Sequence, residues 1–315
     1  MRRIELLGEV RDTLFKAGFY VSELFSMRPI SFDLIARRDN SLLIIKVLTN
    51  IDSMSEDIAS ELKKLSTLLR GSPIIIGERS GAGLLTEDVV YDRFGIYAIN
   101  LETLHTFFKD GLQPEVYAGP GGFYVNIDHE KLKKLRNEKN LSIGSFARSL
   151  KVSRRTVQMY EEGMNASVEV VIRIEDVLEK NITIPIDIFK RKIPNKDRKP
   201  VIKDVEKFHI FQKEIFKMLE QLGYEVTPLE RAPFEAVSQE KKEILLTCID
   251  EYNKRFLKKA HVINSISKIT EKYAILITNK EVNKKSINGT PIIVKKELQK
   301  TRGPEELLEL LLERL

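Results

Sequence analysis

The 315-residue sequence predicts two mixed α/β domains on either side of an all-α helical bundle. Three observations support this fold class. The two outer thirds of the chain repeat one order of helical and extended patterns. The middle third carries apolar residues at helical spacing. Turn-rich or proline-bracketed segments separate the three parts. We therefore expect an internal duplication interrupted by a helical domain.

The first outer segment begins with apolar residues at helical spacing, followed by Gly18 and short apolar runs typical of strands. Its expected elements are a helix (6–15), strands (19–21, 31–35 and 42–47), a helix (about 53–70), strands (74–76 and 95–99) and a closing helix. This order predicts an α/β domain with a mixed central sheet.

The last outer segment repeats that order. Its expected elements are a helix (208–219), strands (224–226, 233–237 and 244–249), a helix (253–269), strands (275–277 and 289–294) and a closing helix. The strand motifs at 31–35, 42–47 and 74–76 have equivalents at an offset of 201 to 202 residues, as between Phe32 and Phe234. Chance similarity rarely keeps such an offset, so we interpret the two segments as copies.

Two segments typical of turns and linkers set the expected domain boundaries. Gly119-Pro120-Gly121-Gly122 reads as a turn-rich link, and a basic, proline-bracketed run extends from Lys190 to Pro200. We expect domains at 1–118, 123–190 and 204–315, with a basic linker at 191–203.

The composition excludes several classes of protein. No run approaches the ~18 consecutive apolar residues of a membrane span, and the first residues lack the apolar core of a signal peptide. We expect a cytoplasmic protein without membrane contact. The only cysteine, Cys248, cannot form an intrachain disulfide, and the four histidines lack metal-ligand spacing. No glycine-rich phosphate loop or cofactor motif is present, so we expect no cofactor and no metal.

The positive charge is concentrated in the middle of the chain. The net charge is +6, which suits nucleic acid without requiring it. Residues 126–162 hold nine basic and five acidic side chains, and residues 190–200 hold six basic and one acidic.

The middle segment predicts a helix-turn-helix between about Asp128 and Glu162. A first amphipathic helix is expected at 131–140, and Ser142 is a good N-cap for a second helix at 143–150. After a tight turn, Ser153 caps a third helix at 154–162, which stops at Gly163.

The third helix has the composition of a DNA-reading helix. Val157 and Tyr160 are expected to face inward, which leaves polar residues outward in its N-terminal half. Arginine can pair with guanine and glutamine with adenine in the major groove. The expected DNA-binding residues are Ser142, Arg148, Lys151, Ser153, Arg154, Arg155, Thr156 and Gln158.

These residues resemble the Cro/repressor (XRE-type, or Cro/C1-type) helix-turn-helix family. The resemblance rests on Leu141-Ser142, Phe146-Ala147, Val152-Ser153, Thr156-Val157 and Tyr160-Glu161-Glu162-Gly163. It implies a fourth helix, expected at about 167–178. One departure is Ile143, at a position where the family often has a glutamine that braces a phosphate contact. The departure puts that backbone contact in doubt.

The whole chain also resembles an archaeal family of helix-turn-helix transcriptional regulators. Its hallmarks here are Arg28-Pro29-Ile30-Ser31-Phe32-Asp33, Lys46-Val47-Leu48-Thr49-Asn50-Ile51-Asp52 and Ser153-Arg154-Arg155-Thr156-Val157. The resemblance implies transcriptional regulation.

The outer segments resemble the restriction-endonuclease-like fold, whose active members hold Mg²⁺ with two acids near a lysine. Asp33 fits the first acid and Lys46 the lysine, but Ile44 stands where the second acid is needed. Isoleucine offers no oxygen ligand. Glu61, on the next helix, could supply one only with unusual geometry. We expect Asp33 and Lys46 to be a vestigial site that forms a structural ion pair.

The second copy departs further from this pattern. Glu235 could replace Asp33, but the equivalents of Ile44 and Lys46 are Leu246 and Cys248. We therefore expect no catalytic residues in either outer domain, and no enzyme activity.

The leading hypothesis is a sequence-specific transcriptional regulator that binds double-stranded DNA and reads the major groove with the helix at 153–162. We expect a homodimer, although the duplication leaves open a pseudo-symmetric monomer. The outer domains would serve dimerisation, contact with proteins of the transcription machinery, or non-specific DNA contact. Two alternatives remain: a Mg²⁺-dependent nuclease targeted by the helix-turn-helix, and a module that mainly binds proteins. Plasmid cleavage would reveal the first, and partner capture without the middle segment the second.

Overall fold

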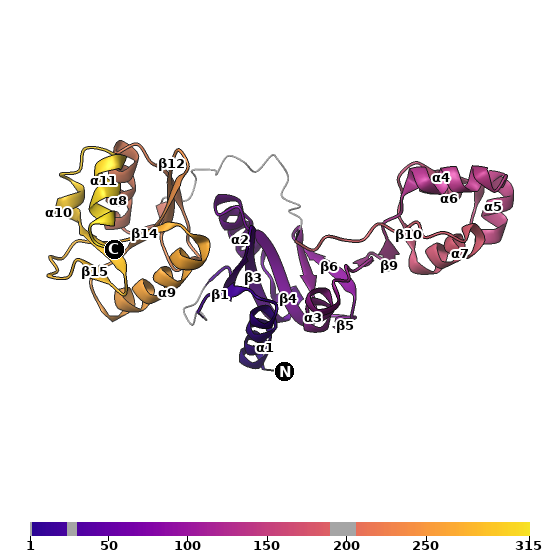
Figure 1. The fold of residues 1–315 in the computed structure, drawn as a ribbon, viewed down its shortest axis with the longest axis horizontal. Helices are drawn as coiled ribbons and strands as arrows, with labels where there is room; N and C mark the ends of the chain where they lie inside the picture. The colour runs from indigo at the N-terminus through magenta and orange to yellow at the C-terminus, as the bar shows by residue number, and fades with distance from the viewer. Residues whose placement is uncertain (1, 24–29, 190–205) are drawn as a thin grey trace. The chain divides into compact units, whose positions relative to one another are not determined.

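The computed structural model describes residues 2–23, 30–189 and 206–315 (Figure 1). The predicted basic linker at 191–203 lies outside these residues. The described chain forms two compact units. One contains residues 48–53 and 75–189, and the other contains residues 2–47, 54–74 and the C-terminal segment from residue 206.

The second of these units holds the start of the first α/β segment. Its elements are α1 (Arg3–Lys16), β1 (Tyr20–Val21), β2 (Leu34–Arg38), the first part of β3 (Ser41–Asn50) and α2 (Glu56–Leu68). Strands β1, β2 and β3 form an antiparallel meander. Strand β2 starts at Leu34, later than predicted, because the amide of Ser31 donates to the carbonyl of Arg231, 2.7 Å away, and not to a neighbouring strand.

The C-terminal α/β segment lies in the same unit. Its elements are α8 (Ile210–Gln221), β11 (Glu225–Pro228), β12 (Ala236–Glu240), β13 (Glu243–Ile249), α9 (Lys254–Thr270), β14 (Tyr273–Thr278), β15 (Ser286–Ile287), β16 (Thr290–Val294), α10 (Lys295–Leu298) and α11 (Pro304–Leu312). The sheet order is β11-β12-β13-β14-β16-β15. Strand β14 is parallel to β13 and β16, and the other pairs are antiparallel.

The sheet of this segment is covered on both faces. Helices α8 and α11 pack on the face that carries Leu245 and Ile249. Successive strand residues point to opposite faces, so Leu246 and Cys248 point the other way, and both are fully buried. Helix α9 contacts β13, β14 and β16, and it also contacts β2 of the first segment.

The predicted duplication is confirmed in the strand register. In the first copy Leu34 pairs with Ile45 across β2 and β3, and in the second Ala236 pairs with Thr247 across β12 and β13. Both pairs are offset by the same 202 positions. Both copies also contain a parallel pair (β4–β7 and β14–β16) followed by an antiparallel one (β6–β7 and β15–β16). The sequence patterns missed β6 (Val89–Arg93) and β15.

The other unit joins the end of the first segment to the helical region. Its elements are the end of β3, η1 (Ile51–Ser53), most of β4 (Ser72–Ser80), β5 (Gly83–Leu84), β6, β7 (Ile96–Ile99), α3 (Leu101–Asp110), β8 (Val116–Gly119), β9 (Gly122–Val125), α4 (His129–Glu138), α5 (Ile143–Leu150), α6 (Arg154–Glu161), β10 (Ala166–Ser167) and α7 (Val168–Leu178). Within it the strands follow the order β4-β7-β6-β8-β9-β10.

The glycine-rich segment at 119–122 is a hairpin turn. Expected as a link between two domains, it joins β8 to β9, with Gly119 paired to Gly122. Strand β8 pairs with β6, and β9 pairs with β10. Glycine suits this turn because Gly121 has a φ of 84° and Gly122 one of 157°, conformations that L side chains rarely adopt. None of the described helices combines the length and apolar character needed to cross a membrane.

Candidate nucleic-acid interface

Helices α4 to α7 form the bundle that holds the predicted DNA-reading helix (Figure 1). The second, third and fourth helices match the predicted ranges closely, and the first starts at His129, two residues early. Each of the first three begins at a side-chain cap. The caps are Asp128, Ser142 and Ser153, which accept hydrogen bonds from the amides of Lys131, Ser145 and Thr156 at 2.9, 3.0 and 3.0 Å.

The bundle core places α6 with one face buried. Val157 is fully buried and Tyr160 is 6% exposed, as predicted, and both pack in one cluster with Phe146 and Leu150 of α5. Ala147 is also buried in this cluster, which allows α5 and α6 to approach closely. Because the buried residues anchor α6, its polar residues are left on the surface.

A buried ion pair joins α4 to α6. Arg136 Nε donates to Glu161 Oε1 at 2.6 Å, and a second guanidinium nitrogen lies 3.3 Å from Oε2. The two side chains are 9% and 8% exposed. Arg136 also donates to the carbonyl of Leu141 at 2.7 Å. This geometry is bidentate and fully paired, so it sets the position of α6 against α4.

The two arginines that open α6 differ in their surroundings. The guanidinium of Arg154 lies over Gly144 of α5: a Cβ at Gly144 would be 3.0 Å from its Nε and 3.2 Å from its Cζ. Arg155 instead lies along α6, with a nitrogen 3.8 Å from Glu162 Oε2. Arg154 and Arg155 are both exposed.

The remaining predicted contact residues divide into exposed and capping groups. Gln158, Arg148 and Lys151 are exposed. The hydroxyl of Thr156 lies 2.8 Å from that of Ser153, so both groups take part in the cap of α6. Ser142 is similarly engaged with Ser145 in the cap of α5. The hydroxyls at Ser142, Ser153 and Thr156 therefore have structural partners besides any DNA.

Sequence reasoning missed two residues of this region. Arg136 was counted among the basic residues of the segment, but its side chain is buried in the ion pair described above. The other eight are exposed: Lys131, Lys133, Lys134, Lys139, Arg148, Lys151, Arg154 and Arg155. Gly144 was assigned no role. A glycine inside a predicted eight-residue helix is unfavourable for the helix. The presence of such an unfavourable residue could have indicated that Gly144 has a packing role.

The bundle contacts the preceding α/β elements through strand pairing and an aromatic cluster. Strand β8 pairs with β6 while Val116 packs against the bundle core. Beyond α7, Ile186 donates through its amide to the carbonyl of Pro114 at 2.8 Å. Phe189 packs against Phe107 and Phe108 of α3, with ring centroids 5.1 and 5.8 Å apart. The helical bundle is therefore bound to α3 and β6 at both of its ends.

The acid at Asp33 in the first copy is engaged by the chain's own groups. Asp33 is 1% exposed and accepts from the amide of Val47 at 2.8 Å. Its other oxygen pairs with the guanidinium of Arg3 from α1. Lys46 Nζ lies 3.6 Å from Asp33 Oδ2, within ion-pair distance, and it donates to the carbonyl of Ile30 at 2.7 Å. Ile44 is fully buried in the sheet.

The second copy repeats this arrangement with a different cation. Glu235 accepts from the amide of Ile249 at 2.7 Å and from Lys259 of α9. The same ammonium lies 3.0 Å from Asp250 Oδ2. Burial acts to lower the pKa of Lys259, but the facing Glu235 carboxylate outweighs it and raises that pKa. Burial also raises the pKa of the Cys248 thiol, so it stays protonated.

Glu61 has a role that the sequence did not indicate. Its Oε1 accepts a hydrogen bond of 3.3 Å from the amide of Arg231 in the second copy. Asp57 and Lys64 lie on the same face of α2. The Asp57 carboxylate is 3.5 Å from the Arg231 guanidinium, and the Lys64 ammonium donates to the Pro228 carbonyl at 2.9 Å. Burial raises the pKa of Glu61. Glu61, considered from the sequence as an oxygen ligand for Mg²⁺, therefore binds the β11–β12 loop.

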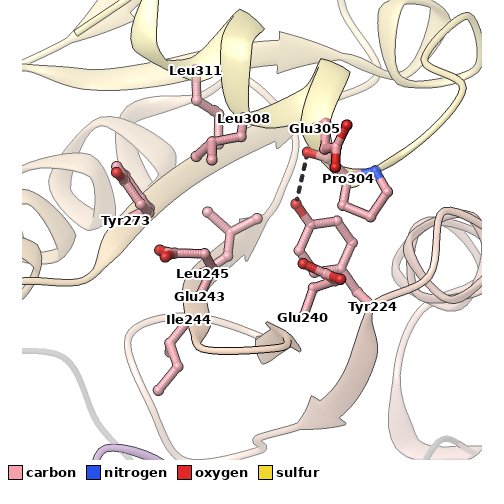
Figure 2. Close-up of a pocket in the computed structure, with 10 residues that line it drawn as sticks. All are labelled: Tyr224, Glu240, Glu243, Ile244, Leu245, Tyr273, Pro304, Glu305, Leu308 and Leu311. Atoms are coloured by element: carbon pink, nitrogen blue, oxygen red, sulfur yellow. Dashed lines mark hydrogen bonds between the residues drawn. The ribbon is translucent and has the colours of Figure 1, made fainter.

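The C-terminal segment contains a cleft between its β12–β13 hairpin and α11 (Figure 2). Leu245, Leu308 and Leu311 line it together with Tyr224, whose hydroxyl donates to the Pro304 carbonyl at 3.4 Å. The acidic lining residues are Glu240, Glu243 and Glu305. Burial and the first two of these glutamates raise the pKa of Tyr224 to about 12. The carboxylates make this cleft unsuited to the phosphates of DNA.

Among residues 2–23, 30–189 and 206–315, no three or more histidine, cysteine, aspartate or glutamate side chains are arranged to hold a metal ion.

Comparison with protein families supports both parts of the predicted fold. Residues 3–114 match the model described as "PD-(D/E)XK superfamily domain", and residues 132–184 match the one described as "Helix-turn-helix". The first match agrees with the predicted nuclease-like fold, and the second spans the bundle.

Curated proteins resemble the chain along its full length. A protein of Methanosarcina acetivorans named "Putative HTH-type transcriptional regulatory protein" is 40% identical over 321 residues, covering 100% of this chain and 98% of its own. A relative of the same name from Methanocella arvoryzae is 40% identical, covering 100% and 97%. One from Halobacterium salinarum is 36% identical, covering 100% and 98%. No solved structure matches the chain.

Proposed function

The chain belongs to a family of archaeal HTH-type transcriptional regulatory proteins, and we propose that it regulates transcription by binding specific sequences of double-stranded DNA through α6. One observation carries the proposal. The buried Val157 and Tyr160 anchor α6, while Arg155 and Gln158 remain exposed on its outer face. These are side-chain types that pair with guanine and adenine in the major groove. In this proposal the chain acts in the cytoplasm.

The charge around α6 supports binding to the DNA backbone. The eight exposed basic side chains named above lie in the same bundle as α6, and lysine and arginine release counterions when they neutralise phosphates. The affinity should therefore fall steeply as salt rises. The expected slope of log affinity against log salt is about −0.9 for each phosphate neutralised.

The test is selection of genomic fragments by the full-length protein, followed by binding measurements on the enriched sequence. The variant Arg154→Ala/Arg155→Ala/Gln158→Ala should lose the enriched sequence, whereas Lys196→Ala in the basic run should keep it. If the triple variant bound the enriched duplex as tightly as the parent, α6 would not be the reading helix. The symmetry of the enriched site would also separate a homodimer, with half-sites about 34 Å apart, from a monomer.

We also propose that the nuclease-like domains do not cleave DNA. Metal-assisted cleavage needs hard oxygen ligands, but Ile44 and Leu246 stand at the second acid position of the two copies. The remaining carboxylates, Asp33 and Glu235, are occupied by Arg3 and Lys259. Supercoiled plasmid incubated with Mg²⁺ or Mn²⁺ should stay intact. Cleavage that Asp33→Ala abolished would establish the opposite.

A further inference from the structure

The first turn of α5 and the first turn of α6 meet at Gly144. The guanidinium of Arg154 lies where a side chain at position 144 would begin: its Nε, Cζ and one terminal nitrogen are 3.0, 3.2 and 3.2 Å from the ideal Cβ position. Apart from the residues next to Gly144 and the backbone of α5, these three atoms are the nearest to that position. The missing side chain of Gly144 therefore makes room for the Arg154 guanidinium.

Glycine is a costly choice at this position. In a helix it is about 1 kcal/mol less favourable than alanine. Gly144 has no left-handed φ that would require glycine for the backbone. The backbone conformation thus gives no reason for glycine here, whereas the placement of Arg154 does.

Arg154 also differs from Arg155 in its electrostatic partners. Within the described part of the chain, no carboxylate forms an ion pair with Arg154, whereas Glu162 lies 3.8 Å from Arg155. Arg154 is exposed, so its charge is available to a ligand. Its guanidinium lies over the beginning of α5, the helix that crosses the DNA backbone when α6 enters the major groove.

We propose that Gly144 is a positioning residue that holds Arg154 for a DNA phosphate, leaving base recognition to Arg155 and Gln158. The proposal rests on the proposed function and deepens it. Ile143, the first residue of α5, offers a phosphate no polar side chain. Arg154, lying across the next residue of α5, supplies a cation at the same turn.

The test uses the full-length protein, the enriched duplex and an unrelated duplex, with affinities measured over a range of salt. Arg154→Ala should weaken binding to both duplexes by a similar factor, about tenfold for one lost charged contact. The slope of log affinity against log salt should fall by about 1. A loss confined to the enriched duplex would overturn the proposal, because Arg154 would then read a base.

Gly144→Leu isolates the role of the glycine. Leucine favours the helix over glycine, so thermal unfolding should show a stability equal to or above that of the parent. Binding should nevertheless weaken as in Arg154→Ala, because the leucine displaces the guanidinium. In the Arg154→Ala background Gly144→Leu should cause no further loss.

Ser149→Leu, on an exposed turn of the same helix, is the matched control and should bind as the parent does. Parent-like binding by Gly144→Leu, or an equal further loss in the Arg154→Ala background, would overturn the positioning role. These outcomes are distinct from a failure of the proposed function, in which the parent protein itself would enrich no sequence.

Discussion

The carboxylate of Glu235 accepts a hydrogen bond of 2.7 Å from the backbone amide of Ile249, 14 positions further along the chain. Asp33 and Val47 stand in the same relationship, at 2.8 Å and the same separation. In both copies the acid, directly before one strand, thus binds the backbone of the antiparallel neighbouring strand. A helix supplies the neutralising cation, Arg3 from α1 in one copy and Lys259 from α9 in the other. The two acids therefore have equivalent structural partners in the two copies.

Loss of the cation should destabilise the second copy strongly. Lys259→Met leaves Glu235 buried without its counter-charge, and breaking a buried pair by removing one partner costs about 3–5 kcal/mol. Chemical denaturation should show this loss, whereas Lys258→Met, at an exposed position, should be almost neutral. Adding Glu235→Gln to Lys259→Met should recover part of the stability. An equal loss of stability in Lys259→Met and Lys258→Met would contradict this account.

The ion pair between α4 and α6 should matter for stability and for DNA binding together. Glu161→Ala leaves the buried Arg136 unpaired, so we expect a loss of about 3 kcal/mol in the unfolding of the bundle. DNA binding should weaken because α6 loses its contact with α4. Glu162→Ala, whose side chain is 63% exposed, is the matched control for the stability measurement. Equal stability of the two variants would show that the pair contributes little.

Glu61 should make stability depend on pH. Because burial raises its pKa, the folded state binds the proton more tightly than the unfolded chain does. Its contribution is fully present below the ordinary glutamate pKa and is lost as the pH rises through the raised value. Glu61→Gln should therefore gain in melting temperature relative to the parent between pH 4 and pH 8. A difference that stays constant over this range would argue against the buried carboxylate as its cause.

Arg155 should determine sequence preference more than overall affinity. A bidentate contact with guanine contributes about 1–3 kcal/mol of discrimination against a wrong base. Arg155→Ala should therefore bind the enriched duplex and variants of it changed at the guanine that Arg155 contacts with nearly equal affinity. Lys133→Ala, exposed on α4, should preserve the preference. Undiminished discrimination by Arg155→Ala would remove this residue from the reading set.

Local signals in the sequence determined the helical bundle. Ser142 and Ser153 cap their helices as predicted, and Val157 and Tyr160 are buried as predicted. A cap and a periodic apolar face depend on residues within a few positions of one another. The duplication was equally visible, because the offset between Asp33 and Glu235 is a property of the chain itself. The hairpin turn at 119–122 was misread as a link, since a glycine-rich segment does not indicate which strands it joins.

Three of the ion pairs were decided by the tertiary structure alone. Arg3 reaches Asp33 across 30 positions, Lys259 reaches Glu235 across 24, and Arg136 reaches Glu161 across 25. Arg154 lies against Gly144 for the same kind of reason, because the packing of α5 on α6 sets which side chains touch. A basic residue reads alike in the sequence whether it is exposed to DNA or buried in an ion pair. Only the folded chain, by desolvating one and exposing the other, separates the two roles.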